Sequence, residues 1–278
     1  MKLHSAGIGL RSPHYQALLE TRPEVAWLEI HPENYFCGGV HLQRLEKIRE
    51  HYPVSFHAVG LSLGSHEPVR KEHLSQLKQL VDRFDPVRIS DHASWSASGN
   101  AHLNDLLPLP YNEESLSALC RNIDRVQNIL GREILLENPS SYLTFNTSTM
   151  DEAEFMVAAA ENTGCSLLLD INNIYVQAHN HHLNATDYIK SIPQHLVQEI
   201  HLAGHTTREF AAGKMLIDTH NQPVCDEVWQ LFAAAIQRFG TTPTLIEWDK
   251  DLPALTVLVA EAQKAEGIIQ QEANRAAA

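Results

Sequence analysis

The order of apolar and helical stretches predicts a single (β/α)₈ barrel spanning residues 1–278. Short apolar, β-branched runs alternate with stretches of 3.6-residue periodicity, which is the pattern of βα units around a parallel sheet. Eight such runs occur over a length that is usual for this fold. No linker rich in Ser, Gly or Pro divides the chain, so we expect one domain with a weakly ordered, Ala-rich tail after about Gly267.

Each element follows from the local pattern. The expected strands are Ala6–Leu10, Val25–Ile30, Val54–Ala58, Val87–Ser90, Glu133–Glu137, Ser166–Asp170, Val197–Leu202 and Thr244–Trp248. The expected helices are Ser12–Thr21, Leu42–Tyr52, Val69–Phe84, Glu113–Leu130, Met150–Thr163, Asp226–Phe239 and Leu252–Glu266. An open doubly wound sheet is disfavoured because Gly7-Ile8-Gly9 lacks the third glycine of the dinucleotide-binding fingerprint.

Composition argues against several functional classes. The formal net charge of −13 repels phosphate backbones and so disfavours nucleic acid as a partner. The sequence shows neither a signal peptide nor an apolar run of membrane-spanning length, so we expect a cytoplasmic protein without a membrane association. The four cysteines form no CxxC pair, which disfavours a disulfide framework or a structural zinc site.

Six consecutive predicted strands end in His, Glu or Asp, and the carboxyl ends of barrel strands meet in one pocket. These residues are His57, His92, Glu137, Asp170, His201 and Glu247. Any one of them could be a helix cap or a solvated carboxylate. Six together would be a costly set of buried polar groups unless metal ions held them. The donors are nitrogen and oxygen without thiolate, which suits iron, zinc or manganese, and their number exceeds what one ion can use.

The segment after the seventh strand adds Asp218 and His220 to this set. Alternate residues of an extended segment point to the same side, so the two side chains can chelate one ion. The chain also carries 17 histidines, an unusually high number for its length, which strengthens the metal hypothesis at the strand ends.

Eight motifs carry a family resemblance. They are Gly7–Arg11, Leu28–Phe36, His57–Ser65, Ser90–Trp95, Glu137–Tyr142, Asp170–Val176, Glu199–His205 and Ile217–His220. In this order they resemble the multinuclear non-heme iron-dependent oxidative enzymes, the family that includes the methanobactin-biosynthesis oxidase. The resemblance spans about residues 5 to 250.

The same order is similar to the trinuclear-zinc apurinic endonucleases and the wider xylose-isomerase-like barrels. The resemblance implies the metal ligands His57, His92, Glu137, Asp170, Asn173, His201, Asp218, His220 and Glu247. Asn173 stands where the endonuclease pattern has a third histidine, and this departure favours the iron family.

The resemblance to the iron family implies a chemistry. Its members modify cysteine residues of ribosomally made precursor peptides, using dioxygen at a mixed-valent centre of two or three iron ions. They commonly work with a partner protein that binds the peptide leader. Glu137, Asp170 and His220 are the residues that we expect to take part in catalysis. Zinc or manganese is the alternative metal. A phosphodiesterase, a sugar isomerase and a non-catalytic scaffold are the alternative functions.

Several polar residues near the strand ends are expected to support the ligands or to contact substrate. They are Arg11, Glu33, Asn34, Asp91, Asn138, His205 and Asp249. The histidine cluster of His179, His181 and His182 falls in a polar stretch, which we interpret as a solvated loop.

Overall fold

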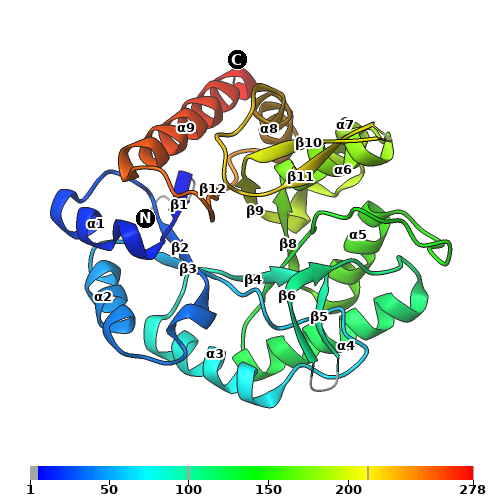
Figure 1. Ribbon diagram of the computed structural model, residues 1–278, viewed down its shortest axis with the longest axis horizontal. Coiled ribbons are helices and arrows are strands. Elements are labelled where there is room, and N and C mark those ends of the chain that lie inside the picture. Colours follow the sequence, from blue (N-terminus) through cyan, green and yellow to red (C-terminus); the bar gives the residue numbers. More distant parts are fainter. Residues whose placement is uncertain (1–5, 99–100, 212, 278) are drawn as a thin grey trace.

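The computed structural model describes residues 6–98, 101–211 and 213–277, and eight parallel strands close into a barrel. Figure 1 shows the strands at the centre of a ring of helices. Around the barrel the strands follow the order β1, β12, β9, β8, β7, β4, β3 and β2, so the first and last strands of the chain pair with each other. The fold predicted from the sequence is confirmed, and each of the eight predicted strands overlaps a barrel strand.

The barrel strands are β1 (Ala6–Gly9), β2 (Leu28–Ile30), β3 (Val54–His57), β4 (Ile89–His92), β7 (Leu135–Glu137), β8 (Ser166–Asp170), β9 (Val197–Leu202) and β12 (Thr244–Ile246). The helices are α1 (Tyr15–Thr21), α2 (Val40–Arg49), α3 (Lys71–Phe84), α4 (Glu113–Leu130), α5 (Glu152–Thr163), α6 (Ile171–His181), α7 (Ala185–Ser191), α8 (Asp226–Phe239) and α9 (Leu255–Ala277). Three short 3₁₀ helices are η1 (Ser12–His14), η2 (Pro32–Tyr35) and η3 (Gln194–Leu196).

Side-chain caps explain where several of these helices begin. The Asn112 side chain accepts the N–H of Ser115 at the start of α4. Asp151 and Glu154 form a reciprocal capping box at the start of α5. These helices are found where the apolar periodicity predicted them, and α4 and α8 match the predicted bounds.

Two antiparallel hairpins were not predicted. One consists of β5 (Trp95–Ser98) and β6 (Ala101–Leu107), and the other of β10 (His205–Phe210) and β11 (Gly213–Asp218). Both follow barrel strands that contribute to the site, namely β4 and β9. Strand β10 is largely exposed and mostly polar, so it lacks the alternation of apolar and polar residues that marks a half-buried strand. Strand β5 has only four residues, too few for a clear pattern.

The expected solvated loop after the sixth barrel strand is wrong. Helix α6 starts directly after β8, and it includes His179 and His181, while His182 ends it in the left-handed conformation with φ 57°. The ring of His181 is hydrogen-bonded to the carbonyl of Ser141 at 2.8 Å. One face of α6 packs against the barrel and stabilises the helix. The polar composition of the segment did not indicate a helix.

The expectation of a weakly ordered tail is also not met in the described residues. Helix α9 continues past Gly267 to Ala277. Ile269 is buried, and Glu272 accepts hydrogen bonds from Gln237 and Arg275. The tail is held because α9 packs along β1 and β12 and closes the ring of helices (Figure 1). No helix in the described part of the chain is long and apolar enough to cross a membrane.

Candidate metal centre

Strand register brings the predicted ligands together at the carboxyl ends of the barrel strands. His57, His92, Glu137 and Asp170 are each the last residue of a strand. His92 lies directly beside Glu137 across β4 and β7, and Asp170 lies directly beside His201 across β8 and β9. The rule of polar residues at strand ends therefore places these side chains in neighbouring positions.

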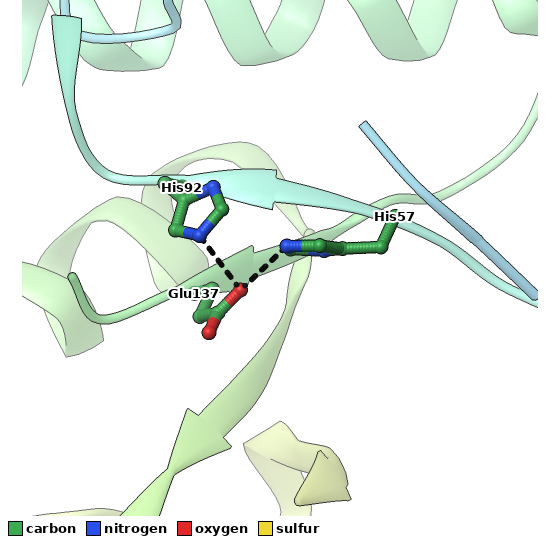
Figure 2. A group of neighbouring side chains, drawn as sticks. All are labelled: His57, His92 and Glu137. Atoms are coloured by element: carbon green, nitrogen blue, oxygen red, sulfur yellow. Dashed lines mark ion pairs between the residues drawn. The ribbon is translucent and has the colours of Figure 1, made fainter. Parts of the chain in front are cut away.

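The first group consists of His57, His92 and Glu137. Figure 2 shows both imidazoles pointing at the same carboxylate oxygen. The Oε2 atom of Glu137 is 3.2 Å from His57 Nε2 and 3.3 Å from His92 Nε2, and all three side chains are buried. This oxygen makes no hydrogen bond of acceptable geometry, so three donor atoms face one another around a space that a cation would fill.

The second group consists of Glu137, Asp170, His201 and Glu247, whose donor atoms all lie within 4.8 Å of one another. His201 Nδ1 is 3.2 Å from Glu247 Oε2 and 3.8 Å from Glu137 Oε1. Glu137 thus belongs to both groups and offers a different oxygen to each. This arrangement suits a carboxylate that bridges two ions.

Asp218 and His220 lie next to the second group. His220 Nε2 is 2.7 Å from Asp218 Oδ1, and His220 Nδ1 is 3.5 Å from Glu247 Oε2. The backbone turns sharply here, because His220 adopts φ 47° and donates its N–H to the carbonyl of Gly204. Gly204 must be a glycine, since a Cβ at this position would lie 2.0 Å from the carbonyl oxygen of Gln222.

The pKa values show that the site favours cations. Burial raises the pKa of Glu137 to about 8, although His92 and His201 lower it. Burial and the nearby Asp218 raise the pKa of Asp170 to about 7. The pKa of His92 rises to about 9, because Glu137 and Asp91 outweigh the opposing effect of burial. Glu137, Asp170 and His92 therefore bind protons more tightly than they would in water. Bound metal ions would replace those protons.

Unsatisfied buried atoms provide an independent test of this fit. Glu137 Oε2 and Asp170 Oδ2 are both buried without a hydrogen-bond partner. Such atoms are rare in folded proteins and call for an explanation. In contrast, His57 Nδ1 is engaged by Ser90 Oγ at 2.8 Å, which leaves Nε2 directed at Glu137. Burial and His92 lower the pKa of His57 well below its usual value, so it is a neutral ring as ligation requires. The residues fit a multinuclear metal centre.

The Asn173 side chain is hydrogen-bonded to the loop after β7. Its amide oxygen accepts a hydrogen bond from Ser140 Oγ at 2.7 Å, and its amide nitrogen donates to the Asn138 carbonyl at 3.0 Å. Asp170 is the N-cap of α6, and its Oδ1 accepts the backbone N–H of Asn173 at 2.6 Å. In this structure Asn173 therefore links the loop after β7 to the start of α6 beside Asp170.

Asp91 and Asn138 are hydrogen-bonded to backbone groups beside the proposed ligands. Asp91 Oδ2 accepts the N–H of Leu61 at 2.9 Å, and its Oδ1 accepts the N–H of His92 at 2.6 Å. Asn138 accepts the N–H of Asp170 at 2.9 Å and donates to its carbonyl at 3.1 Å. Both side chains fix backbone segments that carry proposed ligands.

Arg11 and Asp249 form one side of the site. Arg11 Nε is 2.9 Å from Asp249 Oδ1, and its Nη2 is 3.2 Å from His31 Nε2. Asp249 Oδ2 in turn lies 3.3 Å from His220 Nδ1. The buried guanidinium therefore supports His220 through Asp249.

Glu33, His205 and Asn34 make different contacts around the proposed ligands. Glu33 accepts the N–H groups of Val59 and Gly60, both at 3.1 Å, and so shapes the loop after β3. His205 Nδ1 is 2.8 Å from Asn172 Oδ1, and Asn172 Nδ2 donates to Asp218 at 2.8 Å. The side chain of Asn34 is exposed on η2, and the structure does not bring it to the ligand groups.

Sequence reasoning missed four polar residues at or beneath the site. His31 directly follows β2, and its ring packs edge-on against His57, so the strand-end rule should have included it. Glu29 and Glu199 are buried within strands, and Arg88 is ion-paired with Glu199. A charged residue inside an otherwise apolar strand was the available signal for the last three.

Comparisons with known proteins agree with this architecture. A zinc-binding IolI protein superimposes with a TM-score of 0.62 at 12% identity, covering 96% of this chain and 99% of that one. A xylose isomerase-like TIM barrel protein from Mycobacterium smegmatis, in complex with magnesium, superimposes with a TM-score of 0.59 at 12% identity and 97% coverage of each chain. The protein thus shares the TIM-barrel fold of these structures.

Sequence comparison identifies its family. The model of the RiPP precursor modification enzymes MbnB/TglH/ChrH matches residues 5–270, so the chain belongs to this family of enzymes that modify ribosomally made precursor peptides. A UPF0276 protein of Vibrio parahaemolyticus is 50% identical over 266 residues, which cover 95% of this chain and 92% of that protein. A UPF0276 protein of Acaryochloris marina is 47% identical over 269 residues, covering 97% and 96% of the two chains.

Proposed function

We propose that this enzyme oxidises cysteine residues of its precursor peptide, using dioxygen and a mixed-valent centre of two or three iron ions. The observation that carries the proposal is the buried pair of donor groups that share Glu137, in a chain of the precursor-modification family. The donors are imidazole and carboxylate, which suit iron, with zinc or manganese as the alternative.

The residues would divide among the ions as the geometry suggests. His57, His92 and Glu137 would hold one ion, and Glu137, Asp170, His201 and Glu247 would hold a second. Asp218 and His220 would serve a third ion beside Asp170. Iron bound there would supply dioxygen activation and an open position for a substrate thiolate.

The chain's own residues have separate tasks in this proposal. Glu137 keeps two ions close together and balances their charge. Asp170 and His220, at the edge of the second group, are the residues that we propose to contact the reacting substrate. His220 is oriented by Asp249, which Arg11 holds in place. The side chain of His31, which is 17% exposed, lies 3.9 Å from Glu247 at the same site.

The thiol would come from the substrate. Neither the donor groups found in the described residues nor the proposed third pair contains a cysteine, and Cys165 is buried away from them. The acidic character of the chain suits a basic leader peptide or a basic surface of a leader-binding partner protein, and it disfavours nucleic acid.

Co-expression with candidate substrates tests the proposal. The enzyme is produced together with the short cysteine-bearing reading frames beside its gene, with and without neighbouring partner genes. Intact mass spectrometry should show a mass change that requires iron and dioxygen and that maps to cysteine. Glu137→Gln serves as the inactive control. Unmodified peptides in every combination, together with metal-dependent cleavage of abasic DNA by the same preparation, would support the phosphodiesterase alternative instead.

A further inference from the structure

A second set of charged side chains lies beneath the candidate metal centre. Glu29 on β2 and Glu199 on β9 are fully buried inside the barrel. His201 Nε2 is 3.3 Å from Glu199 Oε1 and 3.5 Å from Glu29 Oε2. Its other ring nitrogen, Nδ1, faces Glu247 and Glu137 in the proposed ligand group. The two nitrogens of one imidazole therefore face two different pairs of carboxylates.

Arg88 links this lower pair to the opposite end of the barrel. It directly precedes β4, and its Nε is ion-paired with Glu199 Oε2. Its guanidinium lies over the ring of Trp27, at 4.5 Å from the centroid, and it lines a cavity of about 1100 Å³ at the amino-terminal ends of the strands. A line of direct contacts thus runs from this cavity through Arg88 and Glu199 to His201.

Glu29 and Glu199 differ in how they are held. Both oxygens of Glu29 are buried without a hydrogen bond, whereas Glu199 is fixed by the arginine. Arg88 therefore compensates the charge of Glu199 and restricts its orientation, and only Glu199 is aligned toward His201 by a second group. Two buried carboxylates thus lie near the same imidazole nitrogen, and only one of them is held by an arginine. Their variants can therefore be compared directly.

An imidazole binds a metal ion through one nitrogen while the other carries a proton, and the acceptor of that proton decides which nitrogen is free. We propose that Glu199, held by Arg88, is a positioning residue that accepts the Nε2–H of His201 and so makes Nδ1 the metal-binding atom. The inference rests on the proposed metal centre, because it requires His201 to be a ligand. It assigns a function to Glu199 and Arg88, two charged residues that the ligand set does not use.

Cobalt binding to the metal-free full-length protein tests the role of Glu199. Co²⁺ is titrated in competition with a chelator, and its visible absorption spectrum reports the ligand geometry. Glu199→Gln keeps the volume of the side chain but removes the charge and its pairing with Arg88. We expect it to weaken the binding of one cobalt ion about 10- to 100-fold and to change its spectrum, as is usual for the loss of a carboxylate behind a histidine ligand. Arg88→Gln should act in the same direction.

Glu29→Gln is the matched control, and His201→Ala is the reference for loss of the ligand itself. Glu29→Gln should change cobalt affinity less than Glu199→Gln, since within the described residues Arg88 is ion-paired with Glu199 and no Lys or Arg is ion-paired with Glu29. If Glu199→Gln binds cobalt as the wild type does while His201→Ala loses an ion, the positioning role is wrong and the metal centre stands. If Glu29→Gln and Glu199→Gln lose the same amount of cobalt affinity, the effect comes only from removing a negative charge near the site. This result would also overturn the positioning role.

Two further outcomes can be distinguished: His201 is not a ligand, or the Glu199→Gln variant does not fold. If His201→Ala keeps full cobalt affinity, His201 is not a ligand, and this inference fails together with that part of the proposed centre. The proposed function is then tested separately, by measuring peptide modification. Melting of the metal-free variants reports folding. If Glu199→Gln does not fold, Glu199→Asp, which keeps the charge but withdraws the carboxylate from Nε2, should weaken cobalt binding, and unchanged binding would overturn the role.

Discussion

Replacing Glu137 by Gln isolates the contribution of one charge to two metal ions. The amide has the size of the carboxylate, so the packing around His57 and His92 is preserved. Its two oxygens, however, are the atoms that face both donor groups, one toward His57 and His92 and the other toward His201. A neutral amide offers only one oxygen and cannot bridge two cations.

The expected magnitude follows from Coulomb energy and proton competition. Removing one negative charge about 4 Å from a unit positive charge costs about 4 kcal/mol at an effective dielectric constant near 20. The wild-type carboxyl, with a pKa of about 8, must first release its proton near pH 7, which offsets about 1.4 kcal/mol. The net loss of about 2.6 kcal/mol corresponds to about 100-fold weaker binding of each ion. Turnover should be abolished, because both ions depend on this residue.

Elemental analysis and chelator competition on protein purified without air measure this loss. Glu113→Gln is the control, since Glu113 is exposed at the start of α4, far in the chain from any ligand. It should keep wild-type metal content and activity. The bridging role is refuted if Glu137→Gln retains the full metal load and turns over its substrate at the wild-type rate.

Three further predictions concern metal identity, pH and the loops around Asp170. Protein produced with ample iron should contain two to three iron atoms per chain, and one zinc with negligible iron would contradict the proposal. Glu137, Asp170 and His92 have raised pKa values of about 8, 7 and 9, so the folded metal-free protein holds these protons more tightly than the unfolded chain does. The stability they contribute is complete below the unfolded pKa values and is lost as pH rises through the folded ones. The melting temperature of the metal-free protein should therefore fall as pH rises from about 4, the unfolded pKa of the carboxyl groups, to about 9, the folded pKa of His92, and be restored by metal. A rise between about pH 5 and 9 would show that the assigned protons are absent. Asn173→Ala should lower the melting temperature, since it removes hydrogen bonds to Ser140 and Asn138, yet keep the metal content, and loss of an ion would return Asn173 to the ligand set.

Much of the fold could be predicted from local pattern because each barrel strand is buried on both sides. Such strands are short apolar runs, and their ends are marked by the first polar residue, as at His57, Glu137 and Asp170. Helix α6 was missed because its buried face includes the polar residues Asn172, Asn173 and Gln177. The hairpins β5–β6 and β10–β11 were missed because they extend outside the closed barrel sheet. There, contacts made by a few side chains, such as Asn180 with the backbone of Leu216, replace the periodic burial that sequence patterns detect.

The linear order of residues was enough to name most of the site, because polar residues at successive strand ends must converge once a barrel closes. It could not show that Glu137 serves both donor groups, or that the Asn173 amide is occupied by Ser140 and Asn138. Nor could it show that Arg88 reaches Glu199, 111 residues away, inside the barrel. These facts depend on the register between strands and on side-chain direction, which closure of the barrel sets through pairings such as β1 with β12 that span nearly the whole chain.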